Sequence, residues 1–460
     1  MPYTPTQSRR GAVDAARSCN GYGRGFKMPN FTYVDLFAGI GGFRIALDEV
    51  GGRCLGFSEI DRHAAATYLA NFGEGERNFG DVTKIEGLPH ADMLVGGVPC
   101  QSWSVAGKML GFDDPRGRLW LDAIRLVGES RPKVFIFENV KGLYDRRNKE
   151  NLDFLLGRFT EAGYCVGASL LNSYDFGVPQ IRSRLFIAGF RNDCESCFRR
   201  FSFPIGGALH DSLAKYLDGV EERDVRRRKF AAQDLFGGTV PRSRNPFQKD
   251  DELNDFFVMC DTRNGHTTIH SWDMADATAR QKEIMVAIMK NRRRKIYGPK
   301  DGNPLSCEAL REHLPDLRES ELGELVRMGL LRAVGGKYEL FNSKNSAGIG
   351  GVYRMYLPQS KVFSTLTATG TKDVVATDYV GADSSPEEYK REFIEKIVKQ
   401  KKYRPLTVAE TQRIQGFPDS FVPHSVEAVA KKQFGNAVSP PVIRALALAL
   451  IETGVFGGRS

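Results

Sequence analysis

The segment DMLVGGVPCQSWSVAG, residues 92–107, places a single cysteine just after an apolar run that breaks at Gly96 and Gly97. Such a run is typical of a buried strand that opens into a loop, so Cys100 is expected at the carboxyl end of a strand. Open α/β sheets bind their ligands at that edge. A lone cysteine is often only a small buried hydrophobic residue, but Pro99 and the strand-end position favour a nucleophile here.

Acidic residues end two further strand-like runs: Glu59 and Asp61 in SEID, and Asp81 in GDVT. A carboxylate at the end of the second strand can accept hydrogen bonds from a ribose. Each acid taken alone is more often a helix cap, whereas together they favour a ligand. The turn DLFAGIGG lacks the third glycine of the dinucleotide fingerprint and the Lys-Ser/Thr of a phosphate loop. This argues against a pyrophosphate and leaves an adenosyl group open.

The elements that position these residues alternate between strand and helix from Phe31 onward. Runs with strand character are separated by runs whose apolar residues recur at helical spacing, which implies right-handed crossovers and a doubly wound α/β sheet. The strand-like runs are FTYVDLF, RCLGFSEID, ADMLVGG and KVFIFENV, and the helical runs are FRIALDEV, RHAAATYLANFG, RLWLDAIRLV and NLDFLLGRFTEAG. The runs YCVGASLLN and RSRLFIAGF predict a closing hairpin, which makes the sheet mixed.

The regular alternation fails beyond about Phe201 and resumes near Arg404, which predicts a second domain inserted into the first. We expect a disordered extension at residues 1–30, a catalytic and cofactor-binding domain at 31–200, a target recognition domain at 201–400 and a return segment at 401–460. The extension is basic and poor in acids, and a methionine at position 28 precedes the first strand. Met28 is therefore the expected natural start.

Composition limits the class of protein. Eight cysteines in 460 residues do not form a disulfide framework, and Cys194 with Cys197 lacks the second ligand pair that a zinc site needs, so no metal is expected. The sequence shows no secretory signal and no apolar run near the roughly 20 residues of a membrane span, which favours a cytoplasmic protein. A net charge of +9 favours a polyanionic partner, with nucleic acid first.

The order of these motifs resembles that of the DNA (cytosine-5) methyltransferases of bacterial restriction-modification systems. The resemblance covers Phe31 to about Phe190 and Tyr403 to about Leu450. The matching blocks are DLFAGIGGFRIAL, GFSEID, GDVT, GGVPCQSWSVAG, GFDDPRGRLW, FENVKGL, DFGVPQIRSRLF, RPLTVAETQRIQGFPDSF and QFGNAVSPPV. Between them only STLTATG, Ser364 to Gly370, looks like the Thr-Leu element of the family's recognition region. The implied fold is that of the S-adenosylmethionine-dependent methyltransferases.

The resemblance implies catalytic roles for four residues. Cys100 adds to carbon 6 of cytosine, which activates carbon 5 toward a methyl group, and Glu138 contacts ring nitrogen 3 and the amino group. To donate a proton Glu138 must be protonated for part of the cycle, which burial favours. Arg182 and Arg184 lie on one face of a strand by their period-two spacing and resemble the arginines that hold the base carbonyl and the active-site loop.

The implied cofactor is S-adenosylmethionine. The resemblance implies that Phe37 lies against the adenine, that Glu59 binds the ribose and that Asp81 binds the adenine amino group. The remaining matched positions are Gly39, Gly41, Ile60, Val82, Pro99, Leu119, Asn436 and Val438. The last two reach the pocket only if the return segment folds back beside the first strand.

Two features of the inserted region concern DNA. The basic runs Arg226–Lys229 and Arg292–Lys295 are candidate phosphate contacts, although charge runs are as often simply solvated. Residues 279–341 predict a winged-helix-like unit of three helices and a hairpin, with Ser306 as a cap, Leu305 and Leu310 as a hydrophobic staple and Gly335-Gly336 as the turn. Its acidic third helix makes the second basic run, or Lys337, the better phosphate contact. An insertion that touches no DNA is the alternative.

The sequence thus predicts an enzyme, monomeric and associated with the nucleoid, that flips a cytosine out of a specific duplex DNA sequence and methylates it. The expected functional partner is a cognate restriction endonuclease. Two alternatives stay open: a transfer RNA methyltransferase of the same catalytic family, against which the long insertion argues, and a catalytically inactive DNA-binding regulator, against which Cys100, Glu138 and Arg184 argue.

Overall fold

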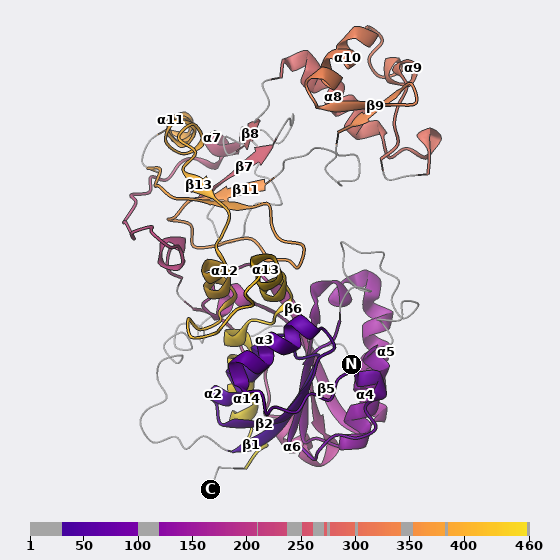
Figure 1. Cartoon of the computed structure of the whole chain (residues 1–460), viewed down its shortest axis with the longest axis vertical. Helices are drawn as coiled ribbons and strands as arrows, with labels where there is room; N and C mark the ends of the chain where they lie inside the picture. Colours follow the sequence, from indigo (N-terminus) through magenta and orange to yellow (C-terminus); the bar gives the residue numbers. More distant parts are fainter. Residues whose placement is uncertain are drawn as a thin grey trace. The chain divides into compact units, whose positions relative to one another are not determined.

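The structure of the protein is a computed structural model, which describes residues 30–99, 119–208, 210–236, 251–260, 271–273, 277–299, 302–341, 353–381 and 385–457. Cys100, Met28 and all but the last residue of the predicted extension lie outside the described residues. The chain divides into two compact units (Figure 1). Unit 1 comprises Met1–Ser212, Lys361–Thr371 and Thr407–Ser460, and unit 2 comprises Leu213–Ser360 and Lys372–Leu406.

Unit 1 is built on a mixed six-stranded sheet. Its strands are β1 (Phe31–Leu36), β2 (Gly52–Ser58), β3 (Met93–Gly97), β4 (Val134–Val140), β5 (Tyr164–Asn172) and β6 (Ser183–Arg191). They lie in the order β2-β1-β3-β4-β6-β5; neighbouring strands among the first four are parallel, and β6 is antiparallel to both β4 and β5. The predicted strands and closing hairpin are confirmed. The carboxyl ends of β1 to β4 therefore lie along one edge.

Helices cover both faces of this sheet. They are α2 (Gly42–Glu49), α3 (Arg62–Phe72), α4 (Leu119–Ser130), α5 (Lys149–Glu161), α6 (Glu195–Phe198), α12 (Val408–Gln415), α13 (Glu427–Asn436) and α14 (Pro440–Glu452). One core lies between the sheet and the helices α4 and α5, and a second core joins the other face to α2 and α14. This arrangement is the predicted doubly wound architecture.

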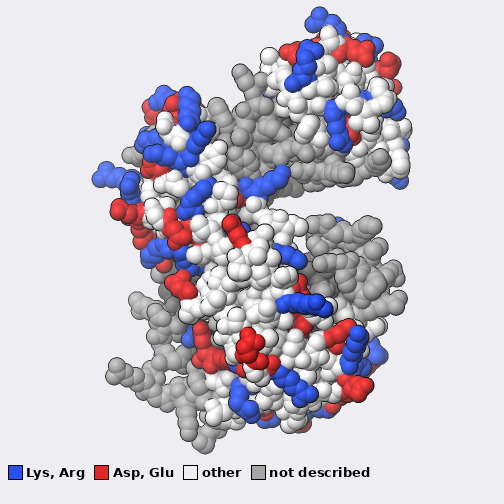
Figure 2. All heavy atoms as spheres, viewed as in Figure 1, with Lys and Arg blue, Asp and Glu red and all other residues white. Residues whose placement is uncertain are grey.

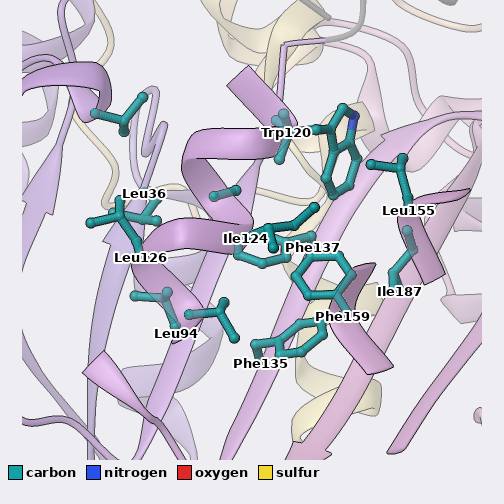
Figure 3. Packing of buried hydrophobic residues seen from close by; sticks show 14 of the residues in the cluster. Leu36, Leu94, Trp120, Ile124, Leu126, Phe135, Phe137, Leu155, Phe159 and Ile187 are labelled. Atoms are coloured by element: carbon teal, nitrogen blue, oxygen red, sulfur yellow. The ribbon is translucent and has the colours of Figure 1, made fainter. Parts of the chain in front are cut away.

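The core under α4 shows how the sequence determines the packing. Trp120, Ala123, Ile124 and Val127 recur at helical spacing and are buried on one side of α4. Figure 3 shows Trp120 beside Phe137 and Phe159, with ring centroids 5.9 and 6.4 Å from the indole. Truncating a fully buried ring of this kind to alanine destabilises a domain by about 3–5 kcal/mol.

The return segment supplies an apolar stretch, Glu427–Glu452, that passes a length and composition test for crossing a membrane. Helices α13 and α14 make up this stretch, with a break at Ala437–Ser439. About 67% of its most apolar window is buried inside the protein, and α14 packs against α2. The burial is that of a core helix.

Unit 2 contains a five-stranded sheet in the order β13-β12-β11-β7-β8. Its strands are β7 (Phe256–Cys260), β8 (Ser271–Asp273), β11 (Tyr353–Tyr356), β12 (Val374–Ala376) and β13 (Tyr403–Arg404), with helices α7 (Ala232–Phe236) and α11 (Pro386–Phe393). Phe257 of β7 stacks on Phe393 of α11, with ring centroids 3.6 Å apart. The sheet and its helix thus share one core.

The boundaries of the units differ from the predicted 201–400 and 401–460 in three places. Residues 201–212 and 361–371 belong to unit 1, and unit 2 extends to Leu406. Segment 361–371 joins unit 1 because it pairs with the chain before β6: Ile181 donates its backbone N–H to Phe363, and Phe363 donates to Pro179. The Thr-Leu element therefore lies in the unit that carries the sheet.

The predicted three helices and hairpin of residues 279–341 are confirmed. They are α8 (Ala279–Asn291), α9 (Cys307–Arg311) and α10 (Glu319–Arg327), followed by the antiparallel strands β9 (Leu331–Val334) and β10 (Lys337–Leu340). Ser306 accepts a hydrogen bond from the N–H of Ala309 as the predicted cap, and Leu305 and Leu310 are buried in a core of this part's own. We call it the winged-helix-like part.

One predicted phosphate contact, Arg292, is wrong, and a second, Arg227, has an acidic partner within its unit. Arg292 is only 2% exposed and lies inside the winged-helix-like part, where Asn303 donates to its carbonyl. Arg227 forms an ion pair with the buried Asp255. An uninterrupted basic run does not show that one member, here Arg292, turns inward. Figure 2 shows acidic and basic residues interspersed over the visible face of each unit.

Candidate active site

The glycine-rich turn after β1 shapes one wall of the site. Phe37, Gly39 and Gly41 all have positive φ angles, of 51°, 56° and 89°. A Cβ atom on Gly41 would lie 2.3 Å from the Phe72 ring, so only glycine fits there. The turn leaves the N–H of Gly39 directed at the Glu59 carboxylate, 2.9 Å from Oε2.

Glu59 follows β2 and is fixed by backbone donors. Its Oε1 accepts from the N–H of Asp61 at 2.7 Å. The side-chain amide of Asn78 accepts from the backbone N–H of Glu59 and donates to its C=O. Burial raises the pKa of Glu59, and the N–H groups of Asp61 and Gly39 partly oppose that rise. The result is an immobile acceptor at the strand end, as a ribose site needs.

Asp61 and Asp81 combine the two roles that the sequence left open. Asp61 caps α3 by accepting from the N–H groups of His63 and Ala64. Asp81 accepts from the N–H and the hydroxyl of Thr83, which caps the short 3₁₀ helix Val82–Lys84. Both acids also line the same cavity, so each one closes a helix end and faces a ligand-sized space.

That cavity has a volume of about 390 Å³ and lies along the carboxyl edge of the sheet. Ten of the eleven predicted cofactor positions line it, and Gly41 is the one that does not. They are Phe37, Gly39, Glu59, Ile60, Asp81, Val82, Pro99, Leu119, Asn436 and Val438. Asn436 and Val438 reach the cavity because the return segment folds back beside α2, where a Cβ on Gly42 would lie 2.7 Å from Val438. The structure thus brings together segments from both ends of the chain.

Glu138 lies at the end of β4 and lines the same cavity. It is 8% exposed, and Arg184 on the neighbouring strand β6 holds its Oε1 at 3.0 Å through Nε. Burial raises the pKa of Glu138, while Arg184 and Arg182 lower it, and the rise prevails. A carboxyl group with a raised pKa keeps its proton to higher pH than an ordinary glutamate, which favours donating that proton to a substrate.

The chain that leads to Cys100 is anchored beside Glu138. Asn139 donates from Nδ2 to the carbonyl of Val98 at 3.1 Å, and a Cβ on Gly97 would lie 3.5 Å from Oε2 of Glu138. The described chain reaches Pro99, which lines the cavity. Gly97 therefore lies within van der Waals range of the carboxyl group, and both line the cavity shortly before the predicted nucleophile in the chain.

Arg182 differs from Arg184 in its surroundings. It is 2% exposed, and its guanidinium donates to the carbonyls of Leu366, Gly435 and Ala437 at 2.8–3.0 Å. These carbonyls belong to the Thr-Leu element, to the last turn of α13 and to the residue after that helix. Arg182 thus ties two distant segments to the sheet.

Several residues of the site are absent from the sequence prediction. His63, Lys432 and Gln433 also line the cavity, and Gln433 belongs to the QFGNAV block that contains Asn436. Asp35, inside the glycine-turn motif, is fully buried, and its carboxylate has no hydrogen-bond partner among the described residues. Burial raises its pKa well above the ordinary range.

Comparisons with known proteins extend over nearly the whole chain. A sequence model of the family described as C-5 cytosine-specific DNA methylase matches residues 31–452. Type II methyltransferase M.HgiBI of Herpetosiphon aurantiacus is 46% identical over 427 residues, which cover 92% of this chain and 97% of that protein. M.HgiCII of the same organism is 45% identical over 93% and 98% of the two chains. M.BanI of Aneurinibacillus aneurinilyticus is 32% identical over 92% and 96%.

Proposed function

We propose that this chain, which belongs to the C-5 cytosine-specific DNA methylase family, methylates carbon 5 of a cytosine within a specific duplex DNA sequence, with S-adenosylmethionine as the methyl donor. The observation that carries the proposal is the buried Glu138–Arg184 pair in the wall of the cavity, beside the chain that leads to Cys100. A proton-exchanging carboxyl group next to a nucleophilic thiol is what activation of a cytosine ring needs.

The cavity fits the proposed cofactor in its donors and acceptors. Glu59 presents a fixed carboxylate suited to ribose hydroxyls, Asp81 an acceptor for the adenine amino group, and Phe37 and Ile60 apolar surface for the ring. The glycine turn lacks the third glycine of the dinucleotide fingerprint and the Lys-Ser/Thr of a phosphate loop, which argues against a pyrophosphate. When bound, S-adenosylmethionine supplies an electrophilic methyl group on a sulfonium centre. Pro99, Leu119, Asn436 and Val438 complete the proposed pocket.

The residues of this chain act on the base. The Cys100 thiolate adds to carbon 6, and Glu138 gives a proton to ring nitrogen 3, so that the electron pair gathers at carbon 5 instead of on the ring nitrogen. After methylation, the carbon-5 proton is lost to solvent and the thiolate leaves carbon 6, which restores the carbon 5–carbon 6 double bond, and ring nitrogen 3 returns its proton to Glu138. Arg184 holds the Glu138 carboxyl in place throughout. Since a stacked cytosine hides carbon 6, the base must rotate out of the duplex first.

We assign sequence recognition to unit 2 and to the Thr-Leu element at residues 364–370. The relatives are named type II methyltransferases, which supports a role in protecting DNA from a cognate restriction endonuclease. An enzyme with that task acts on DNA in the cytoplasm, and the proposed form is a monomer. The family match does not favour transfer RNA as substrate or an inactive regulator.

The experiment starts from bisulfite sequencing of plasmid DNA from expressing cells, which identifies the target site. A duplex with 5-fluorocytosine at that site should then form a covalent adduct in the presence of S-adenosylmethionine, because fluorine cannot leave as a proton does. Cys100→Ala should form no adduct and methylate nothing. Cys165→Ala, at a half-buried thiol on β5, is the matched control and should behave as the unaltered protein does. Methylation by Cys100→Ala would refute the mechanism.

A further inference from the structure

Three polar residues form a stripe along α3 that is independent of the motifs described above. His63, Thr67 and Asn71 are spaced by four, which places them on one face of the helix. Each of them hydrogen-bonds to a residue of the return segment more than 350 positions away in the sequence. We call them the α3 stripe.

The first contact, at the C-terminal end of the stripe, is a pair of hydrogen bonds between a side-chain amide and the backbone of one residue. Asn71 donates from Nδ2 to the carbonyl of Val422 at 2.9 Å and accepts from the N–H of Val422 at 2.7 Å. The middle contact joins the Thr67 hydroxyl to Oε1 of Gln433 at 3.2 Å, and the carbonyl of His63, one turn earlier in α3, shares this donor at 3.0 Å. Thr67 and Gln433 are 4% and 8% exposed, so water cannot readily replace this bond.

The upper contact is between two imidazoles. Nδ1 of His63 lies 3.0 Å from Nε2 of His424, and Nδ1 of His424 accepts from the N–H of Val426 at 3.0 Å. Because Nδ1 of His424 is an acceptor, its ring proton is on Nε2 and is donated to His63. One chain of hydrogen bonds thus runs from α3 to the start of α13.

The stripe joins the two walls of the cavity. His63 lines it from α3, while Gln433, Lys432 and Asn436 line it from α13. An apolar cluster that includes Phe417, Phe421 and Phe434 also packs the return segment here. Apolar packing is non-directional, whereas hydrogen bonds at three points fix the register of the two elements. The stripe is therefore suited to set the shape of the cavity rather than to supply most of the docking energy.

We infer that His63, Thr67 and Asn71 are positioning residues for cofactor binding. They hold the return segment in the one register that aligns Gln433 and Asn436 with the opposite wall. The inference rests on the proposed function. If the register were loose, only a fraction of molecules would be competent to bind, and the dissociation constant would rise in proportion.

The test is Thr67→Val, which removes the hydroxyl and keeps the shape of the side chain. A net hydrogen bond of about 1 kcal/mol corresponds to about a fivefold rise in the dissociation constant of S-adenosylmethionine, measured by titration calorimetry on the free enzyme. The KM for this cofactor should rise equally and kcat at saturation should stay unchanged. Thr67→Ser should restore binding. Arg62→Ala, an exposed change on the same helix, is the matched control.

A second readout reports the register directly. Hydrogen exchange of peptides from 416–438 should be faster in Thr67→Val and in His424→Ala, and cofactor should restore its protection. In a cycle of His63→Ala, His424→Ala and the double variant, the double variant should bind no more weakly than the worse single variant. If Thr67→Val does not fold, Asn71→Leu at the partly exposed end of the stripe takes its place.

Unchanged affinity in folded Thr67→Val and Asn71→Leu, or an equal loss in Arg62→Ala, would overturn the inference. So would a fall in kcat at constant affinity, since that would place the stripe in the chemical step. These outcomes are distinct from failure of the proposed function, in which the unaltered protein itself would not bind S-adenosylmethionine.

Discussion

Each unit contains a largely buried carboxylate paired with an arginine, and the two pairs differ in what surrounds them. Glu138 meets Arg184 at 3.0 Å in the wall of the cavity that Gly97 also lines. Asp255 meets Arg227 in unit 2, and Glu252 lies 3.9 Å from the same guanidinium. The first pair faces a space that a substrate can enter. The second is packed against its own unit.

The difference shows which observation separates a functional ion pair from a structural one. Burial alone does not, since both carboxylates are less than a tenth exposed. Burial raises the pKa of Glu138 above its ordinary range, against the opposing effect of Arg184 and Arg182, so that it can exchange a proton. For Arg227, burial lowers the pKa but Asp255 and Glu252 raise it more, so the guanidinium stays charged. One pair can exchange a proton, and the other holds a cation that stays charged.

The largest effect is expected for Glu138→Gln, which keeps the size of the side chain and an oxygen for Arg184. Loss of the exchangeable proton should lower kcat by a factor of about 10²–10⁴, the usual contribution of a general acid. Because the pKa of Glu138 is raised, the acid form of the native enzyme persists to higher pH than in an ordinary glutamate. In methylation assays across pH, the native enzyme should lose activity as Glu138 loses its proton, and the variant should lack this part of the pH dependence.

The control for this change is Glu129→Gln on the exposed side of α4, which should leave kcat unaltered. The free energy of unfolding of Glu138→Gln should change by less than about 1 kcal/mol, because the amide oxygen still accepts from Arg184. A variant that keeps full activity would place the proton exchange elsewhere and remove the contrast between the two pairs.

A smaller effect is expected for Arg227→Ala, and it concerns the free energy of unfolding instead of kcat. Removing the arginine leaves Asp255 buried without its cation, which should lower the free energy of unfolding by about 1–3 kcal/mol, less than for a fully buried pair because Arg227 is partly exposed. Denaturant unfolding measures this loss. Arg226→Ala removes the same charge from an exposed side chain and should be neutral in stability. Equal stability of the two variants would make the Arg227 pair a surface contact.

The same contrast explains what could be predicted from the sequence. Strands β1 to β4 and their helices follow from local periodicity, and Glu59 and Glu138 follow from their places at strand ends, since parallel strands end at one edge. Asp81 follows no strand; it caps the short 3₁₀ helix Val82–Lys84, so the strand expected before it is wrong. The α3 stripe could not be found in this way because its partners lie over 350 residues away. The spacing of His63, Thr67 and Asn71 is visible in the sequence, but many solvated helices show it. The prediction for Arg292 is wrong because a charge run does not reveal which member turns inward.

The smallest effect concerns the basic turn after α8, where the chain around Arg292 is fixed by Asn303 and Gly298. Arg294 and Lys295 are exposed and form no ion pair with other described residues, whereas Arg280, Arg318 and Arg332 of the winged-helix-like part pair with acids. Glu321 and Glu324 of α10 engage Arg280 and Gln281 of α8, so the third helix is a poor phosphate ligand.

We therefore expect the double variant Arg294→Ala/Lys295→Ala to weaken duplex DNA binding by a few-fold at low salt. The slope of log affinity against log salt should fall by about 0.9 for each phosphate that the variant no longer neutralises, while cofactor affinity and the preference for the target sequence stay constant, because backbone contacts carry charge but no base readout. Arg318→Ala/Arg327→Ala removes the same charge from the same part, at α10 and the residue before it, and should leave the slope unaltered. Fluorescence anisotropy at several salt concentrations measures both. Equal slopes in the two variants would mean that only total charge matters, and would leave the winged-helix-like part without a specific DNA-facing surface.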